Sequence, residues 1–563
     1  MKQLIIATSF LLVAPPLSLN RVKSQLPTPN SQGIHGRSTL STLGIGSREL
    51  GVDADQAAAA AALQTKPEST NFEQTSRYED VAAFLNELAK AAPKVIKLKT
   101  FGTTTEKRAL PLAVVGANDP TAVTVRRTGK LRVYIQGNIH GGEVEGKESA
   151  QMLLRDLAAG RHADWLDDVV LLVAPIYNAD GNERISLRSR GAQHGPIGGQ
   201  GQRANAQGLD LNRDHMKLDS PEARAFVQLM NDYDPHVTMD LHTTNGTRHA
   251  YHLTYAPPLN PATDPSIIGL LRNSWLPWVT QSIRTKYGWD YYYYGNIEGP
   301  RESDGLRAWR SFDHRPRFNN NYVGLRNRFA VLSEAYAYAT FKDRITATTR
   351  FIEENLEYVA KNASRIRRAA EDADRRRVAG QQLALRARMT RSPQPVEILM
   401  GEVTQEKHPV DGHIMDLRKD VKIPEKMADY TTFTATETER VPRAYFIPAE
   451  HTDAIDLLRA HGVGVEMVNR TGTLDGEQFE IATNTQAPGA FQNHRERTLT
   501  GKWVTARLQL TEGMAMIRME QPLAPLAFYL LEPRSDDGLV NWNFLDQALG
   551  PDVKVYPIWR SHR

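Results

Sequence analysis

Cysteine is absent from this chain of 563 residues, and its absence excludes two kinds of architecture. Without thiols there is neither a disulfide framework nor a thiolate metal site. Any zinc would therefore have to be held by histidine and carboxylate side chains. The length is enough for two to four domains with a large core.

An excess of charge of one sign and long apolar runs are also missing. The formal net charge at pH 7 is only +4, so the composition favours no polyanionic partner, and we expect no nucleic-acid binding. The mixed arginines and acids of residues 365–377 are typical of a solvated helix rather than a nucleic-acid patch. Beyond the N-terminus no run is long and apolar enough to cross a membrane. We therefore expect no membrane anchor once a leader is removed.

The N-terminus has the pattern of a secretory signal. Lys2 precedes a mostly apolar run from Leu4 to Val13, which ends at Pro15-Pro16 and is too short to span a bilayer comfortably. A misassigned N-terminus is the alternative, since no clear Ala-x-Ala cleavage site follows. We expect a signal peptide over residues 1–24, a secreted or periplasmic location, and a linker or pro-segment over 25–72, which is rich in small polar residues.

Strands alternate with helices over residues 73–365. An amphipathic helix near 81–88 is followed by an expected strand pair around 95–101 and 110–115, and the apolar run 169–174 is typical of a strand covered on both faces. This alternation predicts an α/β fold with a mostly parallel mixed sheet flanked by helices.

The C-terminal part of the chain has a different pattern. We expect a charged helical connector over 366–391 and a β-rich accessory domain over 392–563, with one helix, Asp453 to Ala460, that ends at Gly462. The strand-like runs are Ala444–Ile447, Val463–Val468, Lys502–Leu508 and Leu526–Leu531. No metal or nucleophile motif stands out in this part.

His140 and Glu143 lie three residues apart on an expected strand-to-helix turn. The strand before them is apolar, and glycines at 137, 141 and 142 allow tight backbone conformations that are closed to bulkier residues. An imidazole and a carboxylate on one turn suit a divalent metal such as zinc. On its own, such a pair can equally be a solvated hydrogen-bonded pair, so a third ligand is needed.

Two further strands supply candidates for the same site. The runs 237–242 and 329–334 each read as a buried strand that ends in a polar residue, His242 and Glu334. In α/β sheets ligands gather beyond the carboxyl ends of strands. His242 is then the natural third ligand, and a His–Glu–His set leaves a coordination position for water, as catalytic zinc sites do. Glu334 could take the proton of that water, or it could be an ordinary carboxylate at a strand end.

The order of motifs over about residues 76–360 resembles the zinc carboxypeptidases of the carboxypeptidase A type. The motifs are His140-Gly-Gly-Glu143, Asn178-Ala-Asp-Gly181, Gly208-Leu-Asp210-Leu-Asn212-Arg213, Asp240-Leu-His242 and Leu332-Ser-Glu334. The resemblance implies one Zn²⁺ per chain, bound by His140, Glu143 and His242, with Glu334 as the catalytic base.

The resemblance also implies roles for residues near 210. Arg213 with Asn212 would hold the free C-terminal carboxylate of a peptide, because a guanidinium meets a carboxylate through two charge-assisted hydrogen bonds. Asp210 would accept a hydrogen bond from the second ring nitrogen of His140. Arg203 resembles the family arginine that stabilises the oxyanion of the reaction.

Other parts of the family pattern are less direct. Arg188 and Arg190 lie in the same variable loop as Arg203 and compete with it for the oxyanion role. Tyr322 is the nearest candidate for the family's mobile, substrate-binding tyrosine. The run Tyr291–Tyr294 reads as a half-buried strand rather than a substrate platform.

We therefore predict a zinc metallocarboxypeptidase whose partner is a peptide with a free C-terminal carboxylate, hydrolysed by attack of zinc-bound water with Glu334 as general base. An amidase or deacylase of N-acyl amino acids or cell-wall peptides is the alternative within the same chemistry. A peptide-binding protein that has lost activity is the alternative of another class. The oligomeric state is not predicted.

Overall fold

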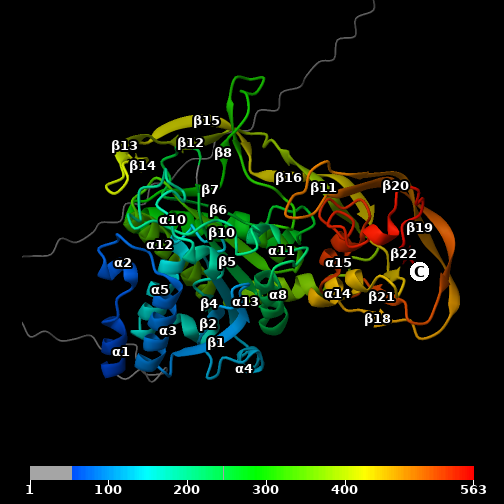
Figure 1. The fold of residues 1–563 in the computed structure, drawn as a ribbon, viewed down its shortest axis with the longest axis horizontal. Coiled ribbons are helices and arrows are strands. Elements are labelled where there is room, and N and C mark those ends of the chain that lie inside the picture. The colour runs from blue at the N-terminus through cyan, green and yellow to red at the C-terminus, as the bar shows by residue number, and fades with distance from the viewer. Residues whose placement is uncertain (1–53, 245) are drawn as a thin grey trace, which may run out of the picture. The chain divides into compact units, whose positions relative to one another are not determined.

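An eight-stranded mixed sheet lies at the centre of the structure, a computed structural model that describes residues 54–244 and 246–563 (Figure 1). Its strand order is β1-β2-β4-β3-β5-β10-β6-β7. The strands are β1 (Ile96–Thr103), β2 (Ala109–Val115), β3 (Leu131–Gly137), β4 (Val169–Ala174), β5 (Val237–Thr243), β6 (Leu253–Ala256), β7 (Tyr291–Tyr293) and β10 (Phe329–Ala335). The neighbours from β4 to β10 pair in parallel, whereas β1, β2 and β6 introduce antiparallel pairs. The expected α/β class with a mixed sheet is confirmed.

Both faces of this sheet are covered. Along β4, alternate side chains enter two different apolar clusters, Val169 and Leu171 on one face and Val170 and Leu172 on the other, and the whole strand is buried. The first face packs against α3 (Tyr78–Ala91), α5 (Glu145–Ala158), α10 (Leu276–Tyr287), α12 (Phe341–Lys361) and α13 (Ala363–Arg375), and the second against α8 (Pro221–Tyr233) and α11 (Asn319–Leu325). The covered apolar run predicted at 169–174 is confirmed.

Local sequence signals explain where helices begin and end. The Ser220 hydroxyl caps α8 by accepting a hydrogen bond from the Ala223 N–H at 3.1 Å, and Pro221 occupies the first turn, where its missing N–H costs nothing. The helix ends at Asp234, which takes the left-handed conformation with φ of 48°. The remaining α-helices of the described residues are α1 (Ala54–Ala61), α2 (Lys66–Ser69), α4 (Ala122–Arg127), α6 (Trp165–Asp168), α7 (Ala179–Glu183), α9 (Pro265–Leu270), α14 (Thr452–Ala460) and α15 (Ala524–Leu531).

The C-terminal part is rich in β-structure, as predicted. A six-stranded sheet has the order β18-β21-β17-β22-β19-β20, a four-stranded sheet has the order β12-β15-β9-β8, and two antiparallel two-stranded sheets, β11-β16 and β13-β14, complete it. The strands are β8 (Asn296–Ile297), β9 (Arg307–Arg310), β11 (Gln382–Thr390), β12 (Val396–Met400), β13 (Val403–Lys407), β14 (Ile414–Arg418), β15 (Ile423–Tyr430), β16 (Thr432–Arg440), β17 (Ala444–Ile447), β18 (Glu466–Met467), β19 (Gly472–Gln486), β20 (Arg497–Leu510), β21 (Ala515–Arg518) and β22 (Trp559–Ser561). Because β9 pairs with β15, one sheet joins residues from both parts of the chain.

Three local expectations for this part are corrected. Residues 526–531 belong to helix α15, not to a strand; every residue of α15 is buried, and a short run that is apolar on all sides carries no period that separates strand from helix. The helical connector expected over 366–391 ends at Arg375, and 382–390 form β11. Within the expected strand 463–468, β18 comprises only Glu466 and Met467, which pair with β21.

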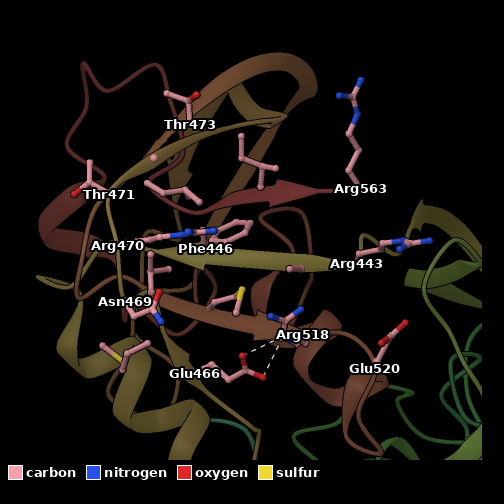
Figure 2. A pocket seen from close by; sticks show the side chains of 17 residues that line it. Arg443, Phe446, Glu466, Asn469, Arg470, Thr471, Thr473, Arg518, Glu520 and Arg563 are labelled. Carbon is pink, nitrogen blue, oxygen red and sulfur yellow. Dashed lines mark hydrogen bonds and ion pairs between the residues drawn. The ribbon is translucent and has the colours of Figure 1, made fainter.

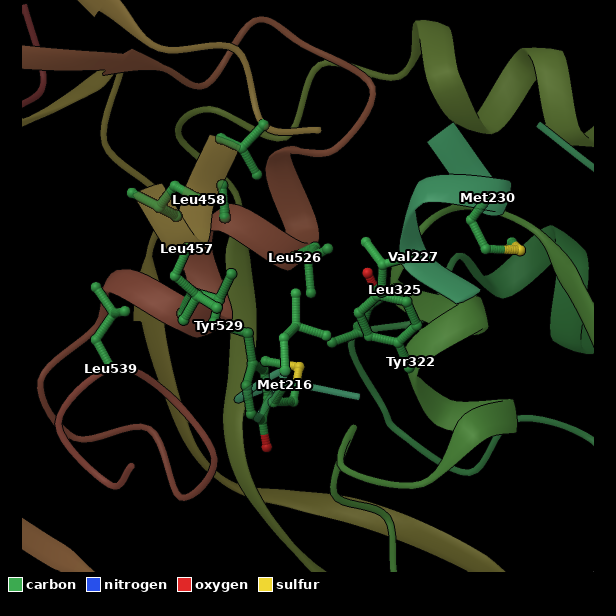
Figure 3. Close-up of a cluster of buried hydrophobic side chains, with 14 of the residues drawn as sticks. Met216, Val227, Met230, Tyr322, Leu325, Leu457, Leu458, Leu526, Tyr529 and Leu539 are labelled. Atoms are coloured by element: carbon green, nitrogen blue, oxygen red, sulfur yellow. The ribbon is translucent and has the colours of Figure 1, made fainter. Parts of the chain in front are cut away.

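An apolar junction joins the two parts of the chain (Figure 3). Met216 and Leu325 from the central α/β part belong to the same buried cluster as Leu458, Leu526 and Tyr529 from the C-terminal part. Burial of apolar surface on both sides is favourable in proportion to its area. The C-terminal part is therefore packed against the central one rather than tethered to it.

His461, which follows α14, provides a polar link across this junction. Its Nε2 lies 3.1 Å from the carbonyl of Met216 and must donate to it, so the neutral ring accepts through Nδ1 from the Tyr322 hydroxyl at 2.8 Å. Arg326 donates to the His461 carbonyl at 2.8 Å. The ring is fully buried, and burial lowers its pKa to about 3.

We predict that this junction makes the protein acid-sensitive. Unfolded histidine binds a proton below about pH 6.5, whereas buried His461 does not, so its contribution to the free energy of unfolding falls by about 1.4 kcal/mol per pH unit below that value and is lost down to about pH 3. The variant His461→Gln should show a smaller drop in thermal midpoint than the natural protein between about pH 7.5 and pH 5. Equal drops would contradict this role.

Candidate metal centre and active site

Hydrogen bonds from neighbouring asparagine side chains and a closely packed glycine stabilise the turn that carries His140 and Glu143. Asn138, in the left-handed conformation with φ of 64°, donates its side-chain amide to three carbonyls of the turn, each at 3.2 Å. Glycine is required at 141, since a Cβ there would lie 2.3 Å from the backbone of Gly181. The Asn178 side chain donates to the carbonyls of residues 139 and 203, which explains why the Asn178-x-x-Gly181 motif accompanies the site.

Strand register brings two further residues to the same edge of the sheet. β5 lies between β3 and β10, all three run parallel, and His242 and Glu334 are direct partners in the β5–β10 pair. Partners in neighbouring strands point to the same face. The carboxyl ends of these strands therefore gather His140, His242 and Glu334, as the sequence predicts.

Two imidazoles and one carboxylate converge on a single point. Nδ1 of His140 lies 3.0 Å from Oε1 of Glu143, and Nδ1 of His242 lies 2.8 Å from Oε2 of the same carboxylate. All three side chains are buried, and their ligand atoms lie within 4.8 Å of one another. This is the donor set that a divalent metal such as zinc requires.

The second nitrogen of each ring is held by a carboxylate. Nε2 of His140 lies 3.0 Å from Oδ1 of Asp210, and Nε2 of His242 lies 2.8 Å from Oδ2 of Asp240. Each Nε2 must donate to its carboxylate, which leaves both Nδ1 lone pairs for the convergence point. The residues present therefore fit a metal, and Asp210 lies where the resemblance implies.

Paired charges set the electrostatics of this centre. Burial alone would raise the pKa of Glu143, but His140 and Arg190 outweigh it and hold that pKa well below its usual range. Burial would lower the pKa of His242, yet Asp240 and Glu143 raise it well above its usual value. Burial raises the pKa of Glu334 to about 7. A carboxyl group with a pKa near neutrality can both accept and return a proton.

The arginines of the site have different surroundings. Arg190 donates to Oε1 of Glu143 at 2.9 Å and to the carbonyls of Thr243 and Thr244 at 2.8 and 3.0 Å. Arg203 forms a two-nitrogen contact with Oδ2 of Asp210 at 2.7 and 3.0 Å and keeps about half of its side chain exposed.

Arg213 and Asn212 lie beside this pair. The Arg213 guanidinium carbon lies 3.8 Å from the centre of the Phe318 ring, and its Nη1 donates to the Asn212 carbonyl at 2.8 Å. The Asn212 side-chain oxygen accepts from the Asn319 N–H at 2.8 Å. Stacking on an aromatic ring leaves the edge of a guanidinium available to an anion.

A pocket of about 210 Å³ contains these groups. It is lined by His140, Glu143, Arg190, Arg203, Asn212, Arg213, His242, Thr243, Thr244, Tyr294, Phe312, Phe318, Leu332 and Glu334. Eight of the nine residues singled out from the sequence are thus within the pocket or, for Asp210, directly bonded to its wall.

Tyr322 is the exception. It is fully buried in α11, where its hydroxyl donates to His461 and accepts from Arg326 at 3.1 Å, and it does not line the pocket. Its packing into the junction prevents contact with a substrate, so the substrate-binding role suggested for it does not hold in this structure.

Three contributors to the site were not recognised from the sequence. Tyr294 follows β7 and lines the pocket; burial and Glu334 raise its pKa, and Asn296 donates to its hydroxyl at 2.8 Å. Asp240 stands in a quoted motif, where its spacing of two from His242 could have indicated its role. The sequence indicates Arg190 only as an alternative for the oxyanion role, whereas the structure shows it bonded to Glu143.

Other candidate sites lack this chemistry. A larger cavity of about 750 Å³ lies among β17, β18, β19 and β21, and the residues that line it include Arg443, Glu466, Arg518 and Glu520 (Figure 2). No metal-ligand group of the described residues falls there. A second His–Asp–His group at 408, 411 and 413 has its His408 nitrogens already bonded to the Ile197 carbonyl and the Val410 N–H. We assign no metal to it.

Within residues 54–244 and 246–563, no helix combines the length and apolar character that a membrane crossing needs.

The buried His–Glu–His set, with the carboxyl group of Glu334 beside it, is the kind of donor arrangement that metal-dependent hydrolases use. Residues 81–267 match the model of the zinc carboxypeptidase family. Carboxypeptidase 2 of Trichophyton tonsurans and that of Trichophyton rubrum are each 24% identical to this chain, over 501 and 506 residues, and each match covers 86% of this chain and 86% of the relative. A crystal structure of carboxypeptidase A from Helicoverpa armigera is 18% identical, with a TM-score of 0.38, and its match covers 57% of this chain and 79% of that one.

Residues 81–267 thus carry a zinc carboxypeptidase domain, and the resemblance stated from the motifs is confirmed for that part of the chain.

We predict that Asp240→Ala weakens metal binding without abolishing it. Loss of a carboxylate behind a ligating histidine typically lowers metal affinity about 10-fold to 100-fold, and His242 would lose its orientation. Competition with a chromophoric chelator measures this, with Asp232→Ala on the exposed face of α8 as the control. Unchanged zinc affinity in a folded Asp240→Ala protein would show that the contact is dispensable.

Proposed function

We propose that this protein removes the C-terminal residue of peptides by zinc-dependent hydrolysis. The observation that carries the proposal is the convergence of His140, Glu143 and His242 beside Glu334, in one pocket that three arginines also line. Zinc held by the three ligands would supply a Lewis acid that acidifies water and polarises the scissile carbonyl. Side chains of the protein would carry out the remaining steps.

Glu334 is the proposed general base. It lies in register with His242, at the end of β10, and its pKa of about 7 suits proton transfer near neutral pH. It would accept a proton from the attacking water and return that proton to the leaving amine. The peptide bond is then replaced by a carboxylate and a free amine.

Arg203 is the proposed donor to the oxyanion. The donors of Arg190 are engaged by Glu143 and two carbonyls, which makes Arg190 a support for the ligand rather than a partner for the substrate. Arg203 keeps Nη1 near Nδ1 of His140 at 3.4 Å, beside the convergence point, and is half-exposed. A pre-oriented donor there would stabilise developing negative charge.

Arg213 and Asn212 are the proposed clamp for the substrate's terminal carboxylate. Both line the pocket, and Arg213 is oriented by Phe318. A guanidinium and an amide together offer enough donors for both carboxylate oxygens. This clamp is the feature that favours an exopeptidase.

The alternatives differ in what they require of this pocket. An amidase or deacylase of N-acyl amino acids would use the same metal set and could also use Arg213, so a substrate panel has to separate it from a peptidase. A peptide-binding protein without activity would be expected to lack a ligand or the base, and all four side chains are present. A secreted or periplasmic location stays a prediction, because residues 1–53 lie outside the described residues.

Glu334→Gln should retain zinc and lose hydrolysis. Removal of a general base typically lowers the rate about 100-fold to 10,000-fold, whereas the ligands are untouched. The matched control is Glu353→Gln: burial also raises the pKa of Glu353, to about 7, but this residue lies on α12 away from the pocket. Turnover and metal content are measured together. Undiminished turnover by Glu334→Gln would remove it from the mechanism.

Arg213→Met should raise KM for a peptide with a free C-terminus. Loss of hydrogen bonds to a charged group costs about 1.5–3 kcal/mol, or roughly 10-fold to 100-fold in KM. The same peptide with an amidated C-terminus should already be a poor substrate of the natural enzyme and should be little affected by the variant. Arg224→Met, at an exposed position of α8, is the control. Equal KM values for both peptides would argue against the clamp.

A further inference from the structure

The loop between β19 and β20, residues 487–496, reaches from the C-terminal part to the segment that carries the proposed carboxylate clamp. The Gln492 side-chain oxygen accepts a hydrogen bond from the main-chain N–H of Asp210 at 2.9 Å, across 282 positions of sequence. Nε2 of His494 lies 2.9 Å from Oδ2 of Asp219. Neither Asp210 nor Asp219 lines the pocket. The loop therefore contacts the segment that carries Asn212 and Arg213 from outside the pocket.

The Asp210 carboxylate contacts three polar side chains that line the pocket. It lies 3.0 Å from Nε2 of His140, 2.7 Å from Nη2 of Arg203 and 3.8 Å from Nη1 of Arg213. Asp210 also begins the short helical turn 211–213, because its side chain accepts from the Asn212 N–H at 2.9 Å. A shift of the Asp210 main chain would thus displace both arginines and the imidazole together.

The other contacts of the loop support the two sides of Arg213. Asp219, which His494 contacts, shares the buried Lys217 with Asp214, the residue after Arg213, at 2.7 Å each. Nη2 of Arg317 also donates to Glu496 of the loop at 2.7 Å. Arg317 immediately precedes Phe318, on which Arg213 stacks.

The loop tip is a two-residue hairpin turn. Phe491 and His494 exchange main-chain hydrogen bonds at 2.8 and 3.0 Å. Between them, Gln492 and Asn493 have φ of 51° and 66°, the left-handed conformation that a type I′ turn requires at both central positions. The turn therefore fixes the backbone from which the Gln492 side chain reaches Asp210.

We propose that Gln492 is a positioning residue of the reaction, which holds the Asp210 main chain so that Arg203 and Arg213 meet the substrate. The inference rests on the proposed carboxypeptidase function. It gives the C-terminal part a role in catalysis: part of the active-site wall is supported from a segment beyond the family-matched residues 81–267. A loop that merely docks would add stability without affecting recognition of the substrate.

The test compares Gln492→Ala and Gln492→Glu with a matched control, Gln521→Ala. Gln521 makes the same kind of bond, with its side-chain oxygen 2.7 Å from the Gly464 N–H, but neither of these residues lines the pocket of the proposed active site. Loss of Gln492 should lower kcat/KM for a free-carboxylate peptide about 10-fold, in the range for supports behind an active-site group, with KM rising more than kcat falls. Gln492→Glu keeps an acceptor oxygen and should recover most of the loss. Thermal midpoint and zinc content should match those of Gln521→Ala.

Two results would overturn the inference. One is a Gln492→Ala enzyme whose kcat/KM equals that of Gln521→Ala. The other is a loss that Gln492→Glu does not recover and that follows the thermal midpoint of each variant, because a purely structural contact behaves in that way. Failure of the proposed function is seen separately, as undiminished hydrolysis by Glu334→Gln and unchanged carboxylate preference in Arg213→Met.

Discussion

The site depends on the parallel pairing of β3, β5 and β10. Because these strands run in one direction, their carboxyl ends meet at one edge of the sheet, and the β5–β10 register sets Glu334 opposite His242. Side chains alternate between faces along a strand, so a slip of one residue would turn Glu334 to the opposite face and bring Ser333 or Ala335 beside the imidazole. Main-chain hydrogen bonds thus fix the relation between a proposed ligand and the proposed base.

Charge pairing makes a buried polar centre of this kind tolerable. An ionised group without a partner is costly in a low-dielectric interior. Here each imidazole has a carboxylate behind it, and Glu143 is contacted by both imidazoles and by Arg190. The same contacts orient the groups, since each Nε2 donates to the carboxylate behind its ring. Electrostatic compensation and geometric order therefore come from one set of residues.

The C-terminal part is continuous with the central α/β part in packing and in polar contacts. Its α15 enters the cluster that covers one face of the sheet, β15 pairs with β9, and His461 accepts from Tyr322. The residue expected to bind substrate is thereby used as a structural link. The composition of the C-terminal part indicated no role for it, yet its residue Gln492 contacts Asp210 next to the proposed active site.

Local sequence determined much of this protein. The runs 131–137, 169–174, 237–243 and 329–335 form strands because their apolar side chains suit burial on a sheet. His140 and Glu143 share a turn because only three peptide bonds separate them and the glycines between them allow a tight backbone. The order of motifs was sufficient to indicate the family. These features depend on residues that are close in sequence, so the spacing of apolar residues along the chain indicates them.

Only the tertiary structure decided which way ambiguous residues face. Tyr322 turns into the junction while Tyr294 lines the pocket, although both are tyrosines in the region between β6 and β10. The run 526–531 is helical because the surrounding core covers all its sides. The contact of Gln492 with Asp210 joins residues 282 positions apart. The free energy of such choices comes from packing and hydrogen bonds between distant segments, which no local pattern contains.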